Sequence, residues 1–94
     1  MKRSVRLTLS AEKDLHRLEL FLAEKSPDAA DRAVAVLAEA ILSLAEYAER
    51  GFPGPLPNLK QIAVPFGDSG YIVQYRIQHD VIVVAHLKHA RERR

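Results

Sequence analysis

Two β-rich runs near the C-terminus, separated by only two residues, constrain the fold of this chain more than any other feature. From residue 71 to residue 78, large apolar side chains alternate with more polar ones, a period of two that is typical of a half-buried strand. Residues 81–87 are almost entirely aliphatic, which indicates a strand that is covered on both sides or central in a sheet. Because only His79 and Asp80 lie between the runs, the sequence predicts a tight hairpin in which Asp80 tolerates a positive φ.

Pairing Gln78 with Val81 would set the register of this hairpin and therefore the two faces of its strands. The pairs predicted on one face are Ile77 with Ile82, Tyr75 with Val84, and Val73 with His86. The other face is predicted to hold Gln74, Arg76, Val83, Ala85, Leu87 and His89. We interpret the first face as core and the second, which ends at His89 and Arg91, as the working surface. The simpler alternative is a solvated sheet face with a frayed C-terminus.

The first half of the chain predicts a short strand followed by two helices. Residues 5–9 alternate between apolar and polar, and Ser10 is the expected N-cap of a helix that runs to about Lys25. Ser26, followed by proline, is a strong start for a second helix, so the two helices should form a tight antiparallel hairpin. We expect Gly51 to cap the end of the second helix.

The second predicted helix has an apolar arc that is too wide for a single contact. Its main stripe is Ala30, Val34, Leu37, Ile41, Leu44 and Ala48, flanked by Val36, Ala40 and Tyr47 on one side and by Ala38, Leu42 and Ala45 on the other. An arc of this width indicates contact with the first helix, with the sheet and with another chain. Leu20, opposite the apolar stripe of the first helix, is either an ordinary exposed leucine or part of the same contact. The candidate partner-binding residues are therefore Leu20, Val36, Ala40 and Tyr47.

The rest of the chain predicts a sheet. Residues 51–58 read GFPGPLPN, a proline- and glycine-rich crossing in which regular structure is not expected. A strand follows at residues 59–64, and residues 66–70 turn into the run that begins at Tyr71. The resulting order of strand, helix, helix and three strands predicts an α+β fold, with a helical hairpin packed on one face of an antiparallel sheet in two layers. At 94 residues, the chain has room for a single domain, residues 1–94.

Composition excludes several classes of protein. Cysteine is absent, so a disulfide framework and a cysteine nucleophile are ruled out. The chain shows no signal peptide and no apolar run near the length of a membrane span, so we expect a cytoplasmic protein that does not enter the membrane. Residues 1–50 hold eight basic and nine acidic side chains, which gives this half a net charge of −1. Residues 51–94 hold six basic and three acidic side chains, which gives the second half a net charge of +3. This bias is too weak to predict direct nucleic-acid binding.

Few chemistries are open to these residues. His86 and His89 are three apart on a strand, so they should point to opposite faces, and we expect neither a metal nor a cofactor. Metal-free RNA cleavage remains, and it requires a base, an acid and cations that stabilise the phosphorane. His89, Arg91, Arg76 and Lys60 are residues of the right type for that reaction. The alternative for Lys60 and Arg76 is ordinary charge on the surface of a strand.

Taken in order, these segments resemble the RelE/ParE family of toxins from bacterial type II toxin–antitoxin modules, and the chain is closer to the ParE branch. The resemblance covers nearly the whole chain. The segments that carry it are Ser10 to Leu15, Ser26 to Ala30, the Gly51/Pro53 break, Leu59 to Ile62, Gly70 to Ile77, and His89 to Glu92. Each motif is weak alone, and their order and spacing together are specific.

The resemblance implies that the first strand lies beside the last and that a ParD-like cognate antitoxin wraps the toxin in a hetero-oligomer. Within this family, ParE-type members poison DNA gyrase and RelE-type members cut mRNA on the ribosome. This chain has Lys60 where many relatives have arginine, and no aromatic residue follows Tyr75. Ribonuclease members often carry an aromatic residue near the C-terminus that stacks on a base, so the absence of such a residue weighs against a ribonuclease.

We therefore predict a ParE-like gyrase inhibitor without an active site of its own. Its antitoxin is expected on Leu20, Val36, Ala40 and Tyr47, and its target on Arg76, His89 and Arg91. Two alternatives stay open: a ribosome-dependent mRNA endonuclease that uses His89, Arg91, Arg76 and Lys60, and a non-toxic binding module of the same fold.

Overall fold

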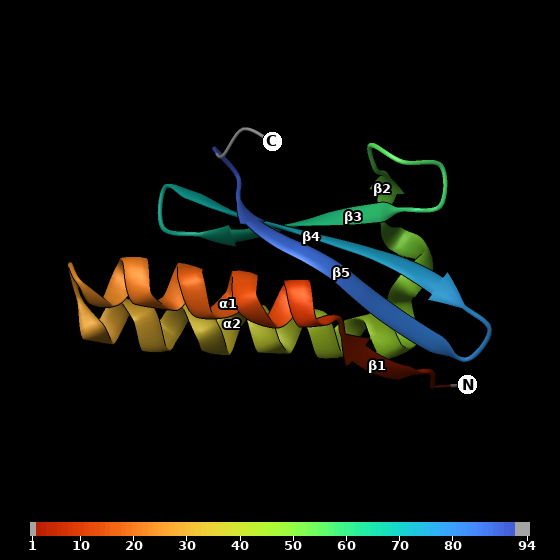
Figure 1. Ribbon diagram of the computed structural model, residues 1–94, viewed down its shortest axis with the longest axis horizontal. Helices are drawn as coiled ribbons and strands as arrows, with labels where there is room; N and C mark the ends of the chain where they lie inside the picture. The colour runs from red at the N-terminus through yellow and green to blue at the C-terminus, as the bar shows by residue number, and fades with distance from the viewer. Residues whose placement is uncertain (1, 92–94) are drawn as a thin grey trace.

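The computed structural model describes residues 2–91, which form two layers (Figure 1). One layer is a pair of antiparallel helices and the other is a five-stranded sheet, with both helices on the same side of the sheet. The helices are α1 (Leu9–Ala23) and α2 (Pro27–Tyr47), and a 3-10 turn, η1 (Ala48–Arg50), continues α2. The strands are β1 (Ser4–Leu7), β2 (Phe52–Pro53), β3 (Lys60–Phe66), β4 (Ser69–Gln78) and β5 (Val81–His89). The predicted α+β architecture is confirmed.

The strand order in the sheet is β1-β5-β4-β3-β2, so the first strand lies beside the last, as the family resemblance implies. Strands β2 to β5 pair antiparallel, but β1 runs parallel to β5, with Val5 opposite Ile82. The sheet is therefore mixed, and the prediction of a purely antiparallel sheet is wrong at this edge. A parallel pair needs a long connection, which the two helices and the intervening strands supply. The short β2, opposite Lys60 and Gln61, also lies where no regular structure was expected.

The β4–β5 hairpin has the predicted two-residue turn, with Gln78 opposite Val81. His79, rather than Asp80, takes the positive φ, at 53°. A non-glycine residue in this region is uncommon, and histidine is one of the types that tolerate it.

The predicted register of this hairpin holds as far as the pair of Tyr75 and Val84, where a β-bulge shifts it. Beyond the bulge, Val73 lies opposite Leu87, one residue further along β5 than its predicted partner. Because side chains alternate along a strand, a shift of one residue moves every later side chain to the other face. Leu87 and His89 therefore face the helices, and their predicted place on the outer face is wrong.

Helix α1 begins earlier than predicted because Thr8, not Ser10, is its N-cap. The Thr8 hydroxyl oxygen accepts a hydrogen bond from the backbone N–H of Ala11 at 3.0 Å. The same hydroxyl donates to the carbonyl oxygen of Ala85, also at 3.0 Å. Thr8 thus starts the helix and joins it to the bulged part of β5, which sets the point where α1 leaves the sheet.

Helix α2 begins as predicted, with the Ser26 hydroxyl oxygen accepting from the backbone N–H of Ala29 at 3.2 Å. Its end differs from the prediction, because Gly51 has a φ of −71° and is not a left-handed cap. A Cβ atom at Gly51 would lie 2.3 Å from the hydroxyl oxygen of Tyr75, so glycine is required for close approach. That hydroxyl donates to the carbonyl oxygen of Ala48 at 2.5 Å and ties β4 to the end of the helical layer.

The core lies between the helices and the face of the sheet that they cover. Its largest fully buried side chains are Tyr75, Leu37, Leu44, Ile82, Leu87, Val73 and Val84. The predicted main stripe of α2 is buried, except for the half-buried Val34. Burial of a side chain of this size contributes about 1.5–3 kcal/mol, so this interface supplies most of the stability of the fold.

Candidate functional site

The two helices carry large apolar side chains on their solvent-facing sides. These residues are Leu9, Leu20, Phe21, Val36, Leu42 and Tyr47, which are between 36% and 67% exposed; we call them the outer helical surface. Single exposed leucines are ordinary, but apolar residues gathered on one layer mark a contact surface. Three of the predicted partner-binding residues, Leu20, Val36 and Tyr47, belong to this surface. The fourth, Ala40, is half-buried and packs against the core.

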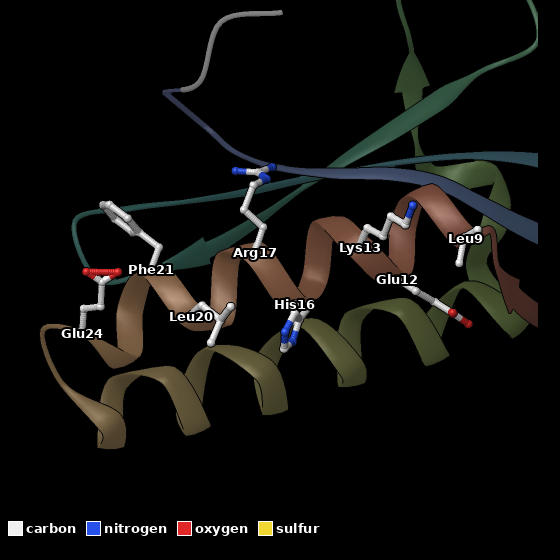
Figure 2. Close-up of a pocket in the computed structure, with 8 residues that line it drawn as sticks. All are labelled: Leu9, Glu12, Lys13, His16, Arg17, Leu20, Phe21 and Glu24. Atoms are coloured by element: carbon white, nitrogen blue, oxygen red, sulfur yellow. The ribbon is translucent and has the colours of Figure 1, made fainter.

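A shallow depression of about 590 Å³, the α1 furrow, runs along the first helix (Figure 2). Its lining residues recur at helical spacing and are Leu9, Glu12, Lys13, His16, Arg17, Leu20, Phe21 and Glu24. Figure 2 shows Arg17 and Phe21 pointing toward the sheet, whereas His16 and Leu20 point toward the side on which α2 lies. Charges of both signs flank the apolar side chains, a pattern that suits an amphipathic helix of a partner better than a simple anion.

A second hollow, the Tyr71 cleft, lies between the latter half of α1, the β3–β4 turn and the end of β5, and its volume is about 650 Å³. Its apolar part is formed by Leu18, Phe21, Leu22, Phe66 and Tyr71, and its rim carries Arg17, Asp68, His89 and Arg91. The ring of Tyr71 lies 6.0 Å from that of Phe66 and meets that of His89 edge to face at 5.6 Å, centroid to centroid. The bulge in β5 is the reason that His89 reaches this cleft at all.

The surroundings of Tyr71 and His89 each determine one chemical feature of the Tyr71 cleft. Burial raises the pKa of Tyr71 above its ordinary value of 10.0, so its hydroxyl stays neutral at physiological pH. The backbone N–H of Arg91 donates to Nδ1 of His89 at 3.2 Å, so in the neutral ring the proton is on Nε2. Arg17, His89 and Arg91 border the cleft beside its apolar floor, and basic groups of this kind bind carboxylate or phosphate oxygens.

The four residues predicted for RNA cleavage fall into two pairs. Lys60 and Arg76 line a small cleft of about 280 Å³ near one end of β4, and His89 and Arg91 line the Tyr71 cleft at the other. His89 lies opposite Tyr71, and the five steps along the strand from Tyr71 to Arg76 span about 17 Å. Arg76 and His89 also point to opposite faces of the sheet, because Arg76 alternates with the inward-facing residues of β4. Each pair therefore lines one hollow, and the two hollows lie at opposite ends of β4.

The strands of the sheet carry basic side chains without acidic ones. The described strands contain Arg6, Lys60, Arg76 and Lys88 but no aspartate or glutamate. Arg6 and Arg76 both lie opposite Val83, which places the two guanidinium groups in one row across neighbouring strands. By the register, Arg6, Arg76 and Lys88 lie on the side of the sheet turned away from the helices, which complements an acidic partner, whereas Lys60 lies in the row of Tyr75.

Asp14 has a specific role at the junction of α1 and β5. It is buried, and its Oδ2 accepts the backbone N–H of Leu87 at 3.0 Å. Arg17 lies 3.7 Å from Oδ1, and Nδ1 of His86 lies 3.5 Å from Oδ2. A usable signal was present in the sequence, since Asp14 occurs at helical spacing between Ala11 and Leu18 on the buried side of α1.

Sequence reasoning also missed Phe21, Arg17 and the Tyr71 cleft. The run from Leu18 to Ala23 holds too many apolar residues for one face of a helix, which could have indicated that Phe21 is exposed. Nothing local could have indicated the cleft, because three elements that are distant in sequence form it. Within residues 2–91, the structure shows no group of three or more histidine, aspartate or glutamate side chains arranged to hold a metal ion. None of the helices in that range is long and apolar enough to cross a membrane.

A helical hairpin with an apolar outer side is packed on a sheet with basic strands, the architecture that the resemblance to the RelE/ParE toxins implies. Family comparison agrees, because the family described as "ParE toxin of type II toxin-antitoxin system, parDE" matches residues 5–94. Toxin RelE3 of Caulobacter vibrioides is 36% identical to the chain over 92 residues, which cover 98% of this chain and 99% of that protein. Toxin RelE1 of the same organism is 34% identical over 91 residues, or 97% of each chain.

Solved structures show the same fold. A chain of the chromosomal ParDE system from P. aeruginosa superposes with a TM-score of 0.81 at 18% identity, over 95% of this chain and 97% of that one. A chain of the toxin–antitoxin complex RelBE2 from Mycobacterium tuberculosis gives a TM-score of 0.66 at 24% identity, over 95% and 99%. By its family match and its relatives, the chain belongs to the ParE/RelE family and is a toxin of the type II toxin–antitoxin class.

Proposed function

We propose that this toxin inhibits DNA gyrase in the cytoplasm by protein–protein binding, without a cofactor, and that a ParD-like antitoxin neutralises it in a hetero-oligomer. The observation that carries the proposal is the division of the molecule into two unlike surfaces. The outer helical surface is apolar, and the strands carry basic residues without acidic ones. Two surfaces of different chemistry suit two partners, one bound through apolar contacts and one through charge.

The outer helical surface is the proposed antitoxin site. The α1 furrow includes Leu20 and Phe21, both more than half exposed, and a row of charged residues on either side of them. An amphipathic antitoxin helix laid in this furrow would cover both side chains. Full burial of each apolar side chain contributes about 1.5–3 kcal/mol, offset by the cost of ordering the partner.

The basic residues near the two ends of β4 are the proposed target contacts. Arg76 lies at one end, and His89 and Arg91 lie in the Tyr71 cleft at the other. Charged residues spread over a surface steer association with an oppositely charged partner and need not converge on one atom. Their separation therefore supports inhibition by binding.

A ribosome-dependent mRNA endonuclease is the second candidate, because two relatives of the chain are named RelE. That reaction needs a base and cations within hydrogen-bond reach of one phosphodiester. The wide separation of Arg76 from His89 along β4 weighs against it. A toxin fold that serves solely as a binding module is the third candidate.

Expression of the toxin without antitoxin, with three readouts, separates these candidates. We expect growth arrest, gyrase-dependent DNA breaks and intact mRNA. Ribosome-bound mRNA cleavage that falls by roughly 10²-fold in His89→Ala would favour the endonuclease. Normal growth in cells that contain the folded protein would exclude both toxic activities and leave the non-toxic binding module as the remaining candidate.

The antitoxin site has its own test, co-expression with the product of the adjacent reading frame. The double variant Leu20→Ser and Phe21→Ser should remain toxic but escape rescue, with at least about tenfold weaker complex formation. The matched control is Leu56→Ser, because Leu56 is 62% exposed but lies in the β2–β3 loop. Rescue of the double variant at wild-type strength would exclude this surface as the antitoxin site.

A further inference from the structure

We infer that the hollow beside Lys60 and Arg76, which we call the Lys60 cleft, is an anion-binding site that takes a phosphate monoester group. The cleft lies at the end of the sheet where β3 begins and β4 ends, away from the Tyr71 cleft (Figure 1). The inference goes beyond the proposed function, because the isolated toxin should bind this ligand without gyrase or an antitoxin.

Every polar side chain that lines the Lys60 cleft can donate hydrogen bonds. Lys60 and Arg76 are joined there by Asn58 and Gln78, whose amide groups also donate, and Ile77 is the apolar member of the lining. No aspartate or glutamate of the described residues lines the cleft. The cleft therefore presents positive charge and neutral donors but no carboxylate to balance them.

The two cationic side chains are not paired within the part of the chain that the structure describes. Both residues are half-buried, yet neither side chain forms an ion pair or a hydrogen bond with residues 2–91. The acidic residue closest to Arg76 in sequence, Asp80, belongs to the β4–β5 turn and does not line the cleft. Two like charges that line one hollow repel each other, so an anion that contacts both relieves this repulsion.

Both cations can line one hollow because it lies at the end of a strand. Lys60 lies opposite Tyr75, so in the interior of a sheet it and Arg76 would point to opposite faces. Lys60 is the first residue of β3, however, so the two long side chains meet around the start of that strand. An anion seated there can therefore accept from the ammonium and the guanidinium group together.

The size and charge of the cleft select a phosphate monoester from other anions. Its volume of about 280 Å³ is just below the usual range of about 300–1,000 Å³ for ligand pockets, so it suits one group of a ligand. A phosphate monoester carries a charge of about −1.5 to −2 at pH 7 and several strong acceptor oxygens, which match two cations and two amides. A carboxylate or a phosphodiester carries a single negative charge and would leave one of the cations unbalanced.

The first test is titration of the isolated full-length toxin with inorganic phosphate and with phenyl phosphate, at constant ionic strength. Binding is followed by the rise in Tm and by NMR shifts of the amides of Lys60, Arg76 and Gln78. We expect both compounds to bind, and dimethyl phosphate and acetate to bind roughly tenfold more weakly, because each loses one charge-assisted contact. Absence of phosphate binding, or equal binding of dimethyl phosphate or acetate, would overturn the inference.

Neutral variants of the two cations test the location of the site. Arg76→Gln and Lys60→Gln should each weaken phosphate binding roughly tenfold or more. Arg6→Gln is the matched control for Arg76, because both arginines lie opposite Val83 but Arg6 is outside the cleft. Lys88→Gln is the control for Lys60, since it is also a half-buried lysine on a strand and lies outside the cleft. An equal loss in the controls would show a response to overall charge and would contradict a site in the cleft.

A third variant supplies the missing negative charge from within. Gln78→Glu places a carboxylate in the cleft at an exposed position without changing the length of the side chain. This variant should have a higher Tm than the wild type in the absence of phosphate, and its Tm should no longer rise when phosphate is added. Phosphate binding at wild-type strength in Gln78→Glu would exclude the Lys60 cleft as the site.

Failure of this inference is distinguishable from failure of the proposed function. If phosphate does not bind the toxin while gyrase-dependent breaks still occur, the anion site is wrong and the proposed function stands. If phosphate binds and the variants respond as expected while no such breaks occur, the target assignment is wrong and the anion site stands.

Discussion

The two halves of β5 differ in the elements that lie beside them, although in the sequence they form one aliphatic run. Residues 81–84 lie between two strands, with β4 on one side and β1 on the other. Residues 85–89 have β4 on one side, and α1 takes the place of the missing strand on the other. There Thr8 bonds the carbonyl oxygen of Ala85, and Asp14 bonds the N–H of Leu87.

This difference shows how a sheet edge can be completed by side chains of a helix. Backbone groups at a buried edge must be paired, and each unpaired N–H costs about 1–3 kcal/mol. Asp14 and Thr8 meet this requirement, and in doing so they hold α1 against the end of β5. The Tyr71 cleft forms beside this junction, so the half of β5 without a second strand neighbour is the half that carries the candidate site.

The largest expected effect tests the bulge that separates the two halves. Leu87→Ala should reduce the free energy of unfolding by about 3 kcal/mol, because the bulge places Leu87 at 0% exposure in the core. Val83→Ala, in the first half and half-buried on the outer face, should cost about 1 kcal/mol or less. Urea unfolding of both variants measures the contrast. Equal small losses would mean that the register continues without a bulge.

The next effect tests the helix-supplied edge. Asp14→Ala leaves the buried N–H of Leu87 without its acceptor, and the loss should be about 2 kcal/mol. For a domain of this size, that corresponds to a fall of roughly 8–16 °C in Tm. Asp14→Asn keeps a carbonyl oxygen at the same place and should lose less. Hydrogen exchange of the Leu87 amide should accelerate in Asp14→Ala, and unchanged protection there would contradict this role.

The smallest effect concerns Tyr75, the β4 residue that adjoins the bulge on the side of the hairpin turn. Tyr75→Phe removes the hydrogen bond to Ala48 and should cost about 1 kcal/mol. Burial raises the pKa of Tyr75 above its ordinary value of 10.0, so the folded state keeps this proton where the unfolded state loses it. Stability from Tyr75 is therefore complete below about pH 10 and is lost as the pH rises through the folded pKa.

The measurement is urea unfolding between pH 8 and pH 11. Wild-type stability should fall at the alkaline end, and the fall should be shallower in Tyr75→Phe. Because burial also raises the pKa of Tyr71, part of the decline should persist in the variant. Parallel curves for the two proteins would show that Tyr75 does not contribute to the alkaline loss.

Much of the fold could be predicted from local patterns. The start of α2 follows from Ser26 and the proline after it, and the β4–β5 hairpin follows from two apolar runs separated by two residues. The candidate site could be predicted less well. Leu20 and Tyr47 were expected to be exposed on the helices and are, but the partners of Asp14 and the place of His89 were not expected.

The sequence by itself determined the element types, their order, the two-layer arrangement and the apolar outer side of the helices, because these depend on the period of hydrophobicity and on capping residues a few positions apart. Tertiary structure alone decided the parallel pairing of β1 with β5, the bulge that turns Leu87 and His89 toward the helices, and the cleft around Tyr71. These features depend on contacts between residues more than 60 positions apart, such as Asp14 with Leu87. A local sequence pattern indicates which face of a segment is apolar. It does not indicate which distant group forms hydrogen bonds with the backbone at the edge of that segment.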